Sequence, residues 1–455
     1  MQKGAMGMAS KHTLDLTKGS VTKKLLVFMV PILLSTVLQH LYTIADRVVV
    51  GNFAADGTTA LAAVGATNSA TNLLLNLFTG ISLGANIVCA NLRGGNRLEK
   101  LRKCMHSAVV LSVIFGVVLM IMGLALAETI LTMMDTPVDV LPQAVTYMRI
   151  FFLGMPGSLV YNFGAAILRS HGDSKRSMYI LGVTGLVNVL LNLLLVMVFH
   201  LDVAGVAIAT IVAQYLSALA VMKILFDKKQ EYKLRFKELK LHKEQVGKMV
   251  AIGVPCGING ILQCLSNVIL QSAVNSFGKY VIAGNTAATD INNFTYLVNN
   301  AFCAACVSFA GQCYGAKEYK RLDKLVVSAA IWNSVFVIAI ASVVTMFPRQ
   351  LLGIFNSDPR VVDAGMFKLI LLSWTAMIYG IGDTLVGCVR GMGKSMVPTV
   401  WNIICLCGIR LVWVLFIFPQ CPRDPRYLYL CFPVSWVIAL VAQTCIFIHY
   451  RKRLK

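Results

Sequence analysis

The chain has 455 residues, of which 57% are hydrophobic and 13% are charged, and its mean hydropathy is +0.72. This composition is too apolar for a soluble globular protein of this length, so it predicts an integral membrane protein. A formal net charge of +21 would suggest a nucleic-acid partner in a soluble protein. In a membrane protein the distribution of that charge matters more than its size, and we expect no nucleic-acid partner.

The polar start, residues 1–24, precedes an apolar run that is too long for the core of a cleavable signal peptide, so we expect that run to be retained. Apolar stretches of about 20 residues, enough to cross a hydrocarbon core of about 30 Å, then recur along the chain. Twelve transmembrane helices are predicted, at residues 25–50, 60–90, 105–127, 144–167, 178–199, 203–226, 246–277, 281–311, 325–347, 366–389, 396–418 and 428–450.

Lys and Arg residues are concentrated in every second connection between these spans. With a cytoplasmic amino terminus, 32 of the 41 Lys and Arg residues fall on the cytoplasmic side, five fall on the other side and four lie within spans. This asymmetry is the positive-inside signature, and it predicts a multi-pass protein of the cytoplasmic membrane with both termini in the cytoplasm. The 13 cysteines are scattered, with spacings that favour packing residues over disulfides or a metal site.

The spans divide into two halves that resemble each other. Pro31 and Gln39 match Pro255 and Gln263 at an offset of 224, and LRSHGDS matches VRGMGKS at an offset of 221. An even number of spans in each half gives both copies the same orientation, so we predict two pseudo-symmetric six-helix lobes around a central cleft. The predicted segments are a cytoplasmic N-terminal segment (1–24), an N-lobe (25–226), a basic linker (227–245), a C-lobe (246–450) and a cytoplasmic tail (451–455).

The basic linker is the longest polar segment within the membrane region. Its amphipathic character fits a lipid-surface helix or a regulatory site, whereas a solvated connector beside anionic headgroups is the simpler interpretation. The chain contains no GxxxxGK[ST] phosphate loop, no HExxH motif and no nucleophile elbow, so the sequence indicates neither an ATP-driven pump nor an enzyme. We see no filter-like loop of a channel, and the two-lobed duplication favours a carrier driven by an ion gradient.

Acidic residues within the spans are few, and Asp46, Asp290 and Asp383 are the candidates. A carboxylate at membrane depth costs a few kcal/mol, about 2.5–3.5 kcal/mol on insertion scales, so it faces a cavity or a partner and marks an ion or substrate path. Asp46 lies beside Arg47, but neighbouring residues on a helix point about 100° apart and face each other poorly. Ion coupling is therefore the preferred role for Asp46, while coupling and structure are equally weighted for Asp383.

Amide side chains cluster in the spans in the same way. Asn188 and Asn192 share one helix face, and Asn68 and Asn72 share another. Asn292 is one of four asparagines that crowd the eighth span. Interhelical hydrogen bonds are the simpler explanation for any single one, but their concentration favours a functional site. Pro31 could also bend the first span and so link protonation of Asp46 to movement.

The ordered motifs VPILLSTVLQHLYTIADRVVVGNF, ALAAVGATNS, LRSHGDSK, NVLLN, GVPCGINGILQ and VRGMGKS resemble the multidrug and toxic compound extrusion (MATE) family, in its bacterial DinF-like branch. The resemblance covers residues 14–450. It implies two six-helix lobes and antiport of cationic or amphiphilic compounds against H⁺ or Na⁺. By this resemblance Asp46 matches the first-helix aspartate implicated in cation coupling, and Asn188 matches an asparagine of the same polar site.

The chain departs from the family pattern at three positions. Asn192 stands where many members have an aspartate, which removes one carboxylate and favours H⁺ over Na⁺. Gln263 stands where NorM-type members have a glutamate, and Asp383 lies about one turn from the tenth-helix aspartate of that branch. The predicted cation-coupling residues are Asp46, Asn188 and Asn192. The predicted substrate-cleft candidates are Asp383, Gln263, Gln39, Asn68, Asn72 and Asn292.

The preferred interpretation is a secondary active multidrug exporter that works by alternating access in the lipid bilayer. It is expected to be a monomer with no cofactor and no metal, using H⁺ or Na⁺ as the coupling ion. The alternative is a lipid-linked oligosaccharide flippase, which would require a strongly basic cleft; Arg47, Arg149, Lys368 and Arg410 are the in-span candidates for one. A membrane scaffold without transport is a more distant alternative.

Overall fold

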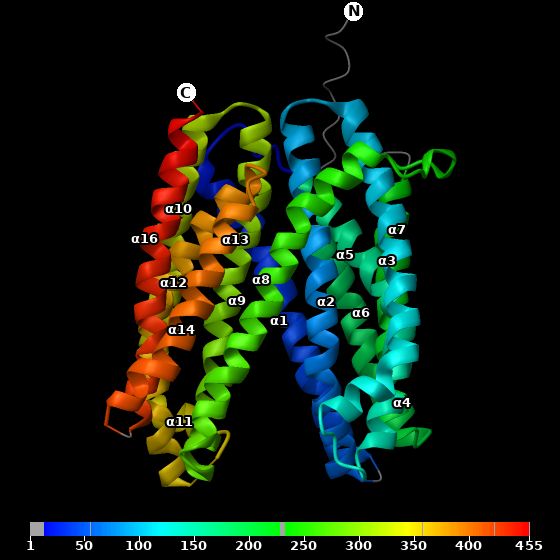
Figure 1. The fold of residues 1–455 in the computed structure, drawn as a ribbon. Coiled ribbons are helices and arrows are strands. Elements are labelled where there is room, and N and C mark those ends of the chain that lie inside the picture. Colours follow the sequence, from blue (N-terminus) through cyan, green and yellow to red (C-terminus); the bar gives the residue numbers. More distant parts are fainter. Residues whose placement is uncertain (1–12, 55, 228–232, 357, 423, 455) are drawn as a thin grey trace, which may run out of the picture. The chain divides into compact units, whose positions relative to one another are not determined.

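The computed structural model describes residues 13–54, 56–227, 233–356, 358–422 and 424–454, without the side chains of residues 68–70, 72 and 73. The regular secondary structure of these described residues is entirely helical (Figure 1). The predicted all-α membrane fold is therefore confirmed.

The described residues form two compact units. The first contains residues 13–15 and 34–257, and the second contains residues 16–33 and 258–454. Two long helices, α1 (Val21–Phe53) and α8 (Lys243–Asn275), each contribute residues to both units. Pro31 lies inside α1 and Pro255 lies inside α8, at equivalent places of the sequence repeat.

The other helices belong to one unit each. The first unit contains α2 (Gly57–Gly94), α3 (Leu98–Met133), α4 (Leu141–Leu153), α5 (Met155–Ser170), α6 (Lys175–Leu193), η1 (Leu194–Val198), α7 (Asp202–Phe226) and η2 (Phe236–Glu238). The second unit contains α9 (Lys279–Gly315), α10 (Tyr319–Met346), α11 (Pro348–Gly353), α12 (Pro359–Gly391), α13 (Met396–Asn402), η3 (Ile403–Gly408), α14 (Ile409–Val412), η4 (Trp413–Ile417), η5 (Phe418–Gln420), α15 (Pro425–Tyr429) and α16 (Cys431–Lys452).

Eleven helical segments among the described residues are long and apolar enough to cross a membrane, and α4 with α5 forms a twelfth if this bent pair counts as one span. The pair bends by 47° at Gly154. Pro156 lies in the first turn of α5, where its missing N–H removes no helical hydrogen bond. Each predicted span therefore corresponds to one helical segment or, for residues 144–167, to the bent pair, and the predicted boundaries differ from the helix ends by several residues.

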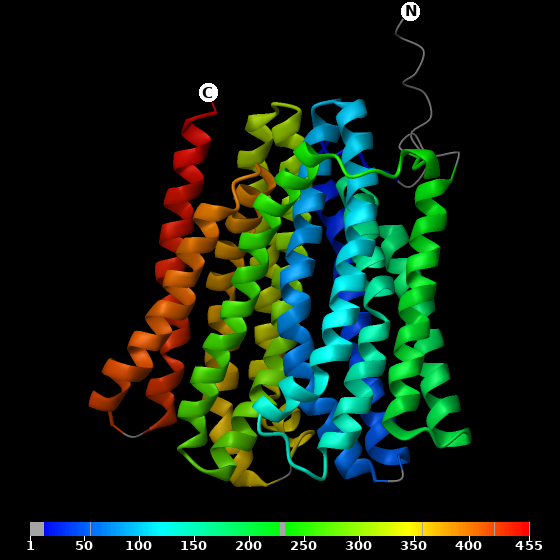
Figure 2. The same ribbon diagram turned by 45° about the vertical axis from the view of Figure 1, so that its right-hand side comes forward.

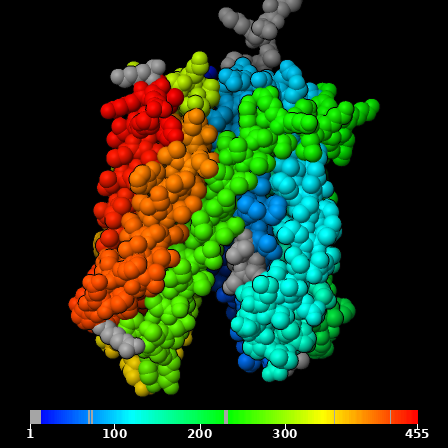
Figure 3. All heavy atoms as spheres, in the orientation of Figure 1, coloured from blue at the N-terminus to red at the C-terminus, as the bar shows by residue number. Residues whose placement is uncertain are grey.

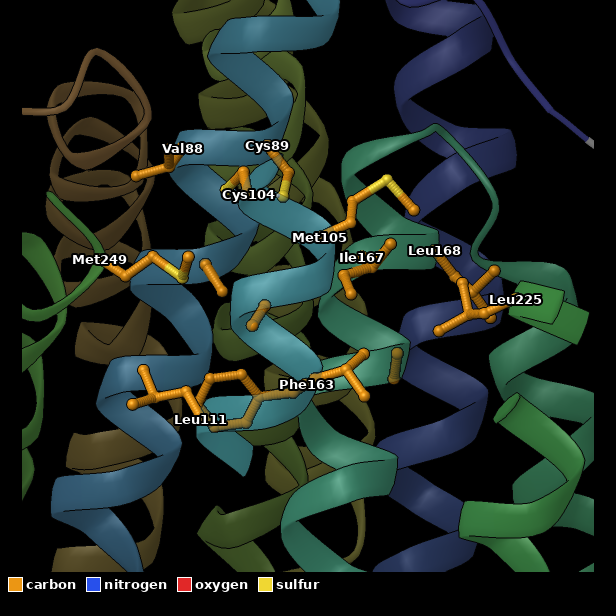
Figure 4. Packing of buried hydrophobic residues seen from close by; sticks show 14 of the residues in the cluster. Val88, Cys89, Cys104, Met105, Leu111, Phe163, Ile167, Leu168, Leu225 and Met249 are labelled. Carbon is orange, nitrogen blue, oxygen red and sulfur yellow. Dashed lines mark hydrogen bonds between the residues drawn. The ribbon is translucent and has the colours of Figure 1, made fainter. Parts of the chain in front are cut away.

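The core of the first unit is built mainly from α2, α3, α5 and α7. Figure 2 shows α2 and α3 lying side by side, and Figure 4 shows Leu111 of α3 and Phe163 of α5 among the side chains of this core. The sulfur atoms of Cys89 and Cys104 lie 3.3 Å apart there, and both cysteines are free and fully buried. These two cysteines pack as small apolar residues, as the sequence predicted.

The described part of the basic linker packs on α3 of the same unit. The backbone N–H of Arg235 donates to Nε2 of His106 at 3.0 Å, and the backbone N–H of His242 donates to Oγ of Ser107 at 3.0 Å. Phe236 stacks on another aromatic ring, Phe226, with ring centroids 4.0 Å apart. Residues 233–242 are thus anchored to α3 at these points, although Arg235, Phe236 and Lys237 are exposed. Residues 228–232 lie outside the described part.

The second unit is organised around the long contact between α9 and α12. Small residues allow this contact: a Cβ atom on Gly365 of α12 would lie 2.7 Å from the backbone oxygen of Gly284 on α9. A Cβ atom on Gly387 would lie 2.7 Å from the backbone oxygen of Cys303. In Figure 3, α16 (red) lies beside α13 and α14 (orange) on the outside of this unit.

Replacing Gly365 by valine should destabilise the second unit by about 1–3 kcal/mol, because the added side chain meets backbone atoms that cannot rotate away. Thermal unfolding of the detergent-solubilised protein measures the effect. Gly353→Ala is the matched control, since nothing lies within 4 Å of a Cβ atom there. Equal melting temperatures for the two variants would contradict this account of the α9–α12 contact.

Candidate functional site

Asp46 belongs to a hydrogen-bonded network in the first unit. Nδ2 of Asn192 donates to Oδ1 of Asp46 and also approaches Oδ1 of Asn188 at 3.4 Å. Nδ2 of Asn188 in turn donates to Oγ1 of Thr210 at 3.4 Å. The network therefore joins α1, α6 and α7, and it brings together all three residues predicted for cation coupling.

The sequence holds these helices close together. The hydroxyl of Tyr42 on α1 donates to the backbone oxygen of Gly182 on α6 at 3.1 Å. A Cβ atom on Gly185 would lie within 1.7 Å of the Tyr42 ring, so only glycine leaves room for that ring. One turn of α1 after Tyr42, Asp46 then faces the asparagines of α6.

The surroundings of Asp46 explain how a carboxylate is tolerated at this depth. Asn192 is fully buried, Asn188 is 5% exposed and Asp46 is partly buried, whereas Arg47 is exposed. The carboxylate oxygen thus receives an amide donor from another helix, as buried charged groups require. The π-helical segment η1 begins two residues after Asn192, and such local widening of a helix is frequent at functional sites.

Gln39, another predicted residue of the first unit, does not join this network among the described contacts. Gln39 is exposed on α1, where its backbone oxygen accepts a hydrogen bond from Thr43. The side chains of Asn68 and Asn72 lie outside the described part of the structure. Their assignment to the substrate cleft stays a prediction. Thr210, which ends the network, was not singled out in the sequence, because one threonine in an apolar span carries no distinctive signal.

The second unit contains a separate cavity of about 360 Å³. Gln263 on α8 and Asn292 on α9, two predicted cleft residues, both line it. Asn292 is buried, and its Oδ1 accepts a hydrogen bond from Oγ of Ser373 at 3.0 Å. Asn293 and Asn300 also line this cavity, so three of the four asparagines that crowd the eighth predicted span meet there.

Asp383 lies on a smaller pocket of the same unit, together with Asn402 and Gln443. Nε2 of Gln443 donates to Oδ1 of Asn402 at 2.9 Å, and Asp383 hydrogen-bonds with the thiol of Cys303. Tyr379 and Trp436 line both this pocket and the larger cavity. Asp383 is therefore near the cavity that holds Gln263 and Asn292, but it does not line that cavity.

Two basic side chains line the larger cavity, and sequence reasoning weighed them only as part of a basic cleft. Lys368 of α12 and Arg410 of α14 are 5% and 8% exposed. Their position within apolar spans could have identified them as candidate site residues. A basic side chain within the membrane is as costly as an acidic one, so it too faces a cavity or a partner. Among the described residues, no group of three or more His, Cys, Asp or Glu side chains could hold a metal ion.

Two pseudo-equivalent bundles of membrane-spanning helices, with a buried carboxylate network in one and a polar cavity in the other, define a transporter rather than an enzyme. A family model described as MatE matches residues 31–194 and again residues 255–415. The two matches begin 224 residues apart and end 221 residues apart, the offsets of the repeat seen in the sequence. The chain belongs to the MatE family, as the sequence motifs predicted.

Curated relatives and solved structures agree with this assignment. The chain is 27% identical over 435 residues to the probable multidrug resistance protein YoeA of Bacillus subtilis, covering 93% of each chain. It is 28% identical over 398 residues to the probable multidrug resistance protein YpnP of the same organism, covering 86% of this chain and 87% of YpnP. A crystal structure of MATE in the straight conformation matches with a TM-score of 0.90 at 19% identity, covering 96% of this chain and 98% of the other.

Replacing Asn192 by leucine should destabilise the protein by about 1–3 kcal/mol, because the variant loses the hydrogen bond that Asn192 donates to the partly buried carboxylate of Asp46. Thermal unfolding measures the loss. Asn162→Leu is the matched control, since Nδ2 of Asn162 donates only to Ser158 within its own helix.

A double-mutant cycle separates the Asp46–Asn192 contact from general packing. The loss of stability caused by Asp46→Leu and Asn192→Leu together should be smaller than the sum of the two single losses. Once one partner of the hydrogen bond is replaced, replacing the other removes no further hydrogen bond between them. Additive effects would contradict the hydrogen bond as the source of stability.

Proposed function

We propose that this protein is a secondary active exporter that exchanges cationic or amphiphilic compounds for H⁺ or Na⁺ by alternating access. The observation that carries the proposal is the partly buried Asp46, hydrogen-bonded across helices to Asn192. A titratable group at membrane depth that has neutral polar partners can change its charge without unfolding its surroundings. The multidrug names of the relatives YoeA and YpnP support the compound class.

Protonation of Asp46 supplies the coupling step. The ionised carboxylate accepts a charge-assisted hydrogen bond from Asn192, and such a bond is stronger than one between neutral groups. A proton arriving from outside neutralises the carboxylate and weakens that bond. Asn192, Asn188 and Thr210 then rearrange, and α1 is released from α6 and α7. Return of the proton to the cytoplasm restores the network.

The composition of the network favours H⁺ as the coupling ion. It contains one carboxylate, and its other members are amides and a hydroxyl. A bound Na⁺ gains from each additional negative ligand, whereas a proton needs a single carboxylate. The asparagine at position 192 thus weakens Na⁺ binding more than it weakens proton uptake.

We also propose a location and an assembly. The excess of Lys and Arg in alternate connections supports the cytoplasmic membrane, with both termini in the cytoplasm. Each half contributes its own polar site, which supports a monomer as the functional state. The lipid bilayer and the exported compounds are the proposed partners.

A lipid-linked oligosaccharide flippase is the second candidate, and Lys368 and Arg410 in one cavity are the observation in its favour. A flippase would bind a pyrophosphate and would be indifferent to Asp46. Export of an organic cation under an ion gradient therefore separates the two candidates.

Asp46→Asn should abolish ethidium export by liposomes that contain the purified protein under an imposed pH gradient, since asparagine cannot carry the proton. Ethidium fluorescence measures the movement. Asp139→Asn, an exposed residue between α3 and α4, is the matched control and should keep the native rate. Movement that ignores both the gradient and Asp46 would refute the antiporter.

Asn192→Asp should increase ethidium export driven by a Na⁺ gradient, because a second carboxylate beside Asp46 strengthens Na⁺ binding. The same liposomes, assayed with a Na⁺ gradient at equal pH on both sides, measure this change. A native chain that already responds fully to Na⁺ would overturn the preference for H⁺ and leave the exporter standing.

A further inference from the structure

The cavity of the second unit differs in charge from the network around Asp46. Its volume of about 360 Å³ lies within the range of small-molecule sites, about 300–1,000 Å³. Among the described residues that line it, none is aspartate or glutamate, whereas Lys368 and Arg410 are both present. Its remaining polar lining consists of amides and hydroxyls, including Gln263 and Asn292.

The amino group of Lys368 has hydrogen-bond acceptors, but among the described residues no carboxylate forms an ion pair with it. Its Nζ donates to the backbone oxygen of Asn285 at 3.2 Å, to Oδ1 of Asn285 at 2.7 Å and to Oγ1 of Thr289. All three protons therefore reach neutral acceptors on α9. Asp290 adds a longer-range attraction, but it does not line the cavity.

Arg410 presents free donors to the same cavity. Its Nε donates to Oγ of Ser435 at 3.4 Å, its one hydrogen bond among the described residues. Its guanidinium lies over the ring of Phe432, 4.4 Å from the ring centroid. The two terminal amino groups are thus left to a ligand, in the planar fork that matches a carboxylate.

Aromatic rings form one wall of the cavity. Tyr379, Tyr296 and Trp436 pack on one another, with ring centroids 5.6 Å apart for Tyr379 and each of the others and 6.4 Å apart for Tyr296 and Trp436. Aromatic side chains in edge-to-face and offset arrangements accept a further flat ring at low entropic cost. The cavity therefore combines a site for a negative charge with a surface for a flat ring.

We propose that this cavity binds an aromatic carboxylic acid, with its carboxylate on the Arg410 fork in the field of Lys368 and its ring against Tyr379 and Trp436. Two buried cations without an acidic partner are costly, and a ligand carboxylate offsets that cost. This inference rests on the proposed function, because it narrows the amphiphilic substrates of the exporter to a chemical class.

The same geometry argues against a pyrophosphate ligand. A pyrophosphate carries several negative charges and requires many donors, but the three protons of Lys368 are already used by Asn285 and Thr289. The fork of Arg410 can satisfy one carboxylate.

The test measures binding without any gradient, using the full chain in nanodiscs of phosphatidylcholine. Dansylglycine is the probe, and its uncharged amide, dansylglycinamide, is the matched control ligand. Energy transfer from tryptophan to the dansyl group reports binding, and empty nanodiscs correct for partition into lipid. We expect the acid to bind about tenfold more tightly than the amide, since a charge-assisted, bidentate contact distinguishes them.

Variants assign that preference to the cavity. Arg410→Gln and Lys368→Gln should each bring the two ligands to similar affinities, while Lys279→Gln, which removes an exposed charge at the start of α9, should keep the preference. Arg410→Lys retains the positive charge but loses the planar guanidinium, so it should keep part of the preference for the acid over the amide. Should a glutamine variant fail to fold, the comparison of acid and amide on the native chain still decides.

Three outcomes would overturn the proposal: equal binding of acid and amide to the native chain, a preference that survives both glutamine substitutions, and loss of the dansylglycine signal when phosphatidylglycerol is added to the discs. The last would assign the cavity to a lipid headgroup. Because ethidium export is measured separately under a gradient, failure of the binding test leaves the exporter standing, and failure of the exporter is recognised in the export assay alone.

Discussion

The structure depends on one constraint: a polar group inside the hydrocarbon region must find its partners within the protein. Asp46 satisfies it through Asn192 on another helix, and Lys368 satisfies it through Asn285 and Thr289. Each of these contacts joins helices that are far apart in the sequence. The few charged side chains within the spans thus join helices to one another. They are also the points at which gain or loss of a proton would change an interhelical contact.

Packing without polar groups follows a different rule. Between α9 and α12, Gly365 and Gly387 let backbones approach so closely that a Cβ atom would collide, and dispersion then holds the helices. A side chain added at either glycine would have to push backbone atoms apart. Under the proposed antiport, by contrast, the hydrogen bonds around Asp46 are remade when a proton arrives, so the proposal assigns movement to that network and stability to the glycine contacts.

The helices were predictable because a span of about 20 apolar residues is a strong signal, and the family motifs supported the same twelve spans. Asp46, Asn188 and Asn192 could be selected because a carboxylate in one span and two amides on one face of another stand out in an apolar sequence. The structure brings the three together, and their role in cation coupling stays a prediction. The sequence could not show that Asp383 lines the smaller pocket and not the larger cavity. Which of two neighbouring pockets a helical residue faces depends on how the helix packs, and the sequence does not give that packing. The angle of 47° between α4 and α5, beside Pro156, needed the structure as well.

The repeat shows how one scaffold acquires two chemistries. The offset of 221 places Asn188 at Ile409, one residue before Arg410, so equivalent helices carry an amide near a carboxylate in one half and a guanidinium in the other. In the second unit Ile409 directly follows the π-helical segment η3, whereas in the first unit η1 begins six residues after Asn188. The repeat therefore places a network of amides and a carboxylate in one half and a guanidinium that lines a cavity in the other, because the residue at each repeated position has changed while the helices have not.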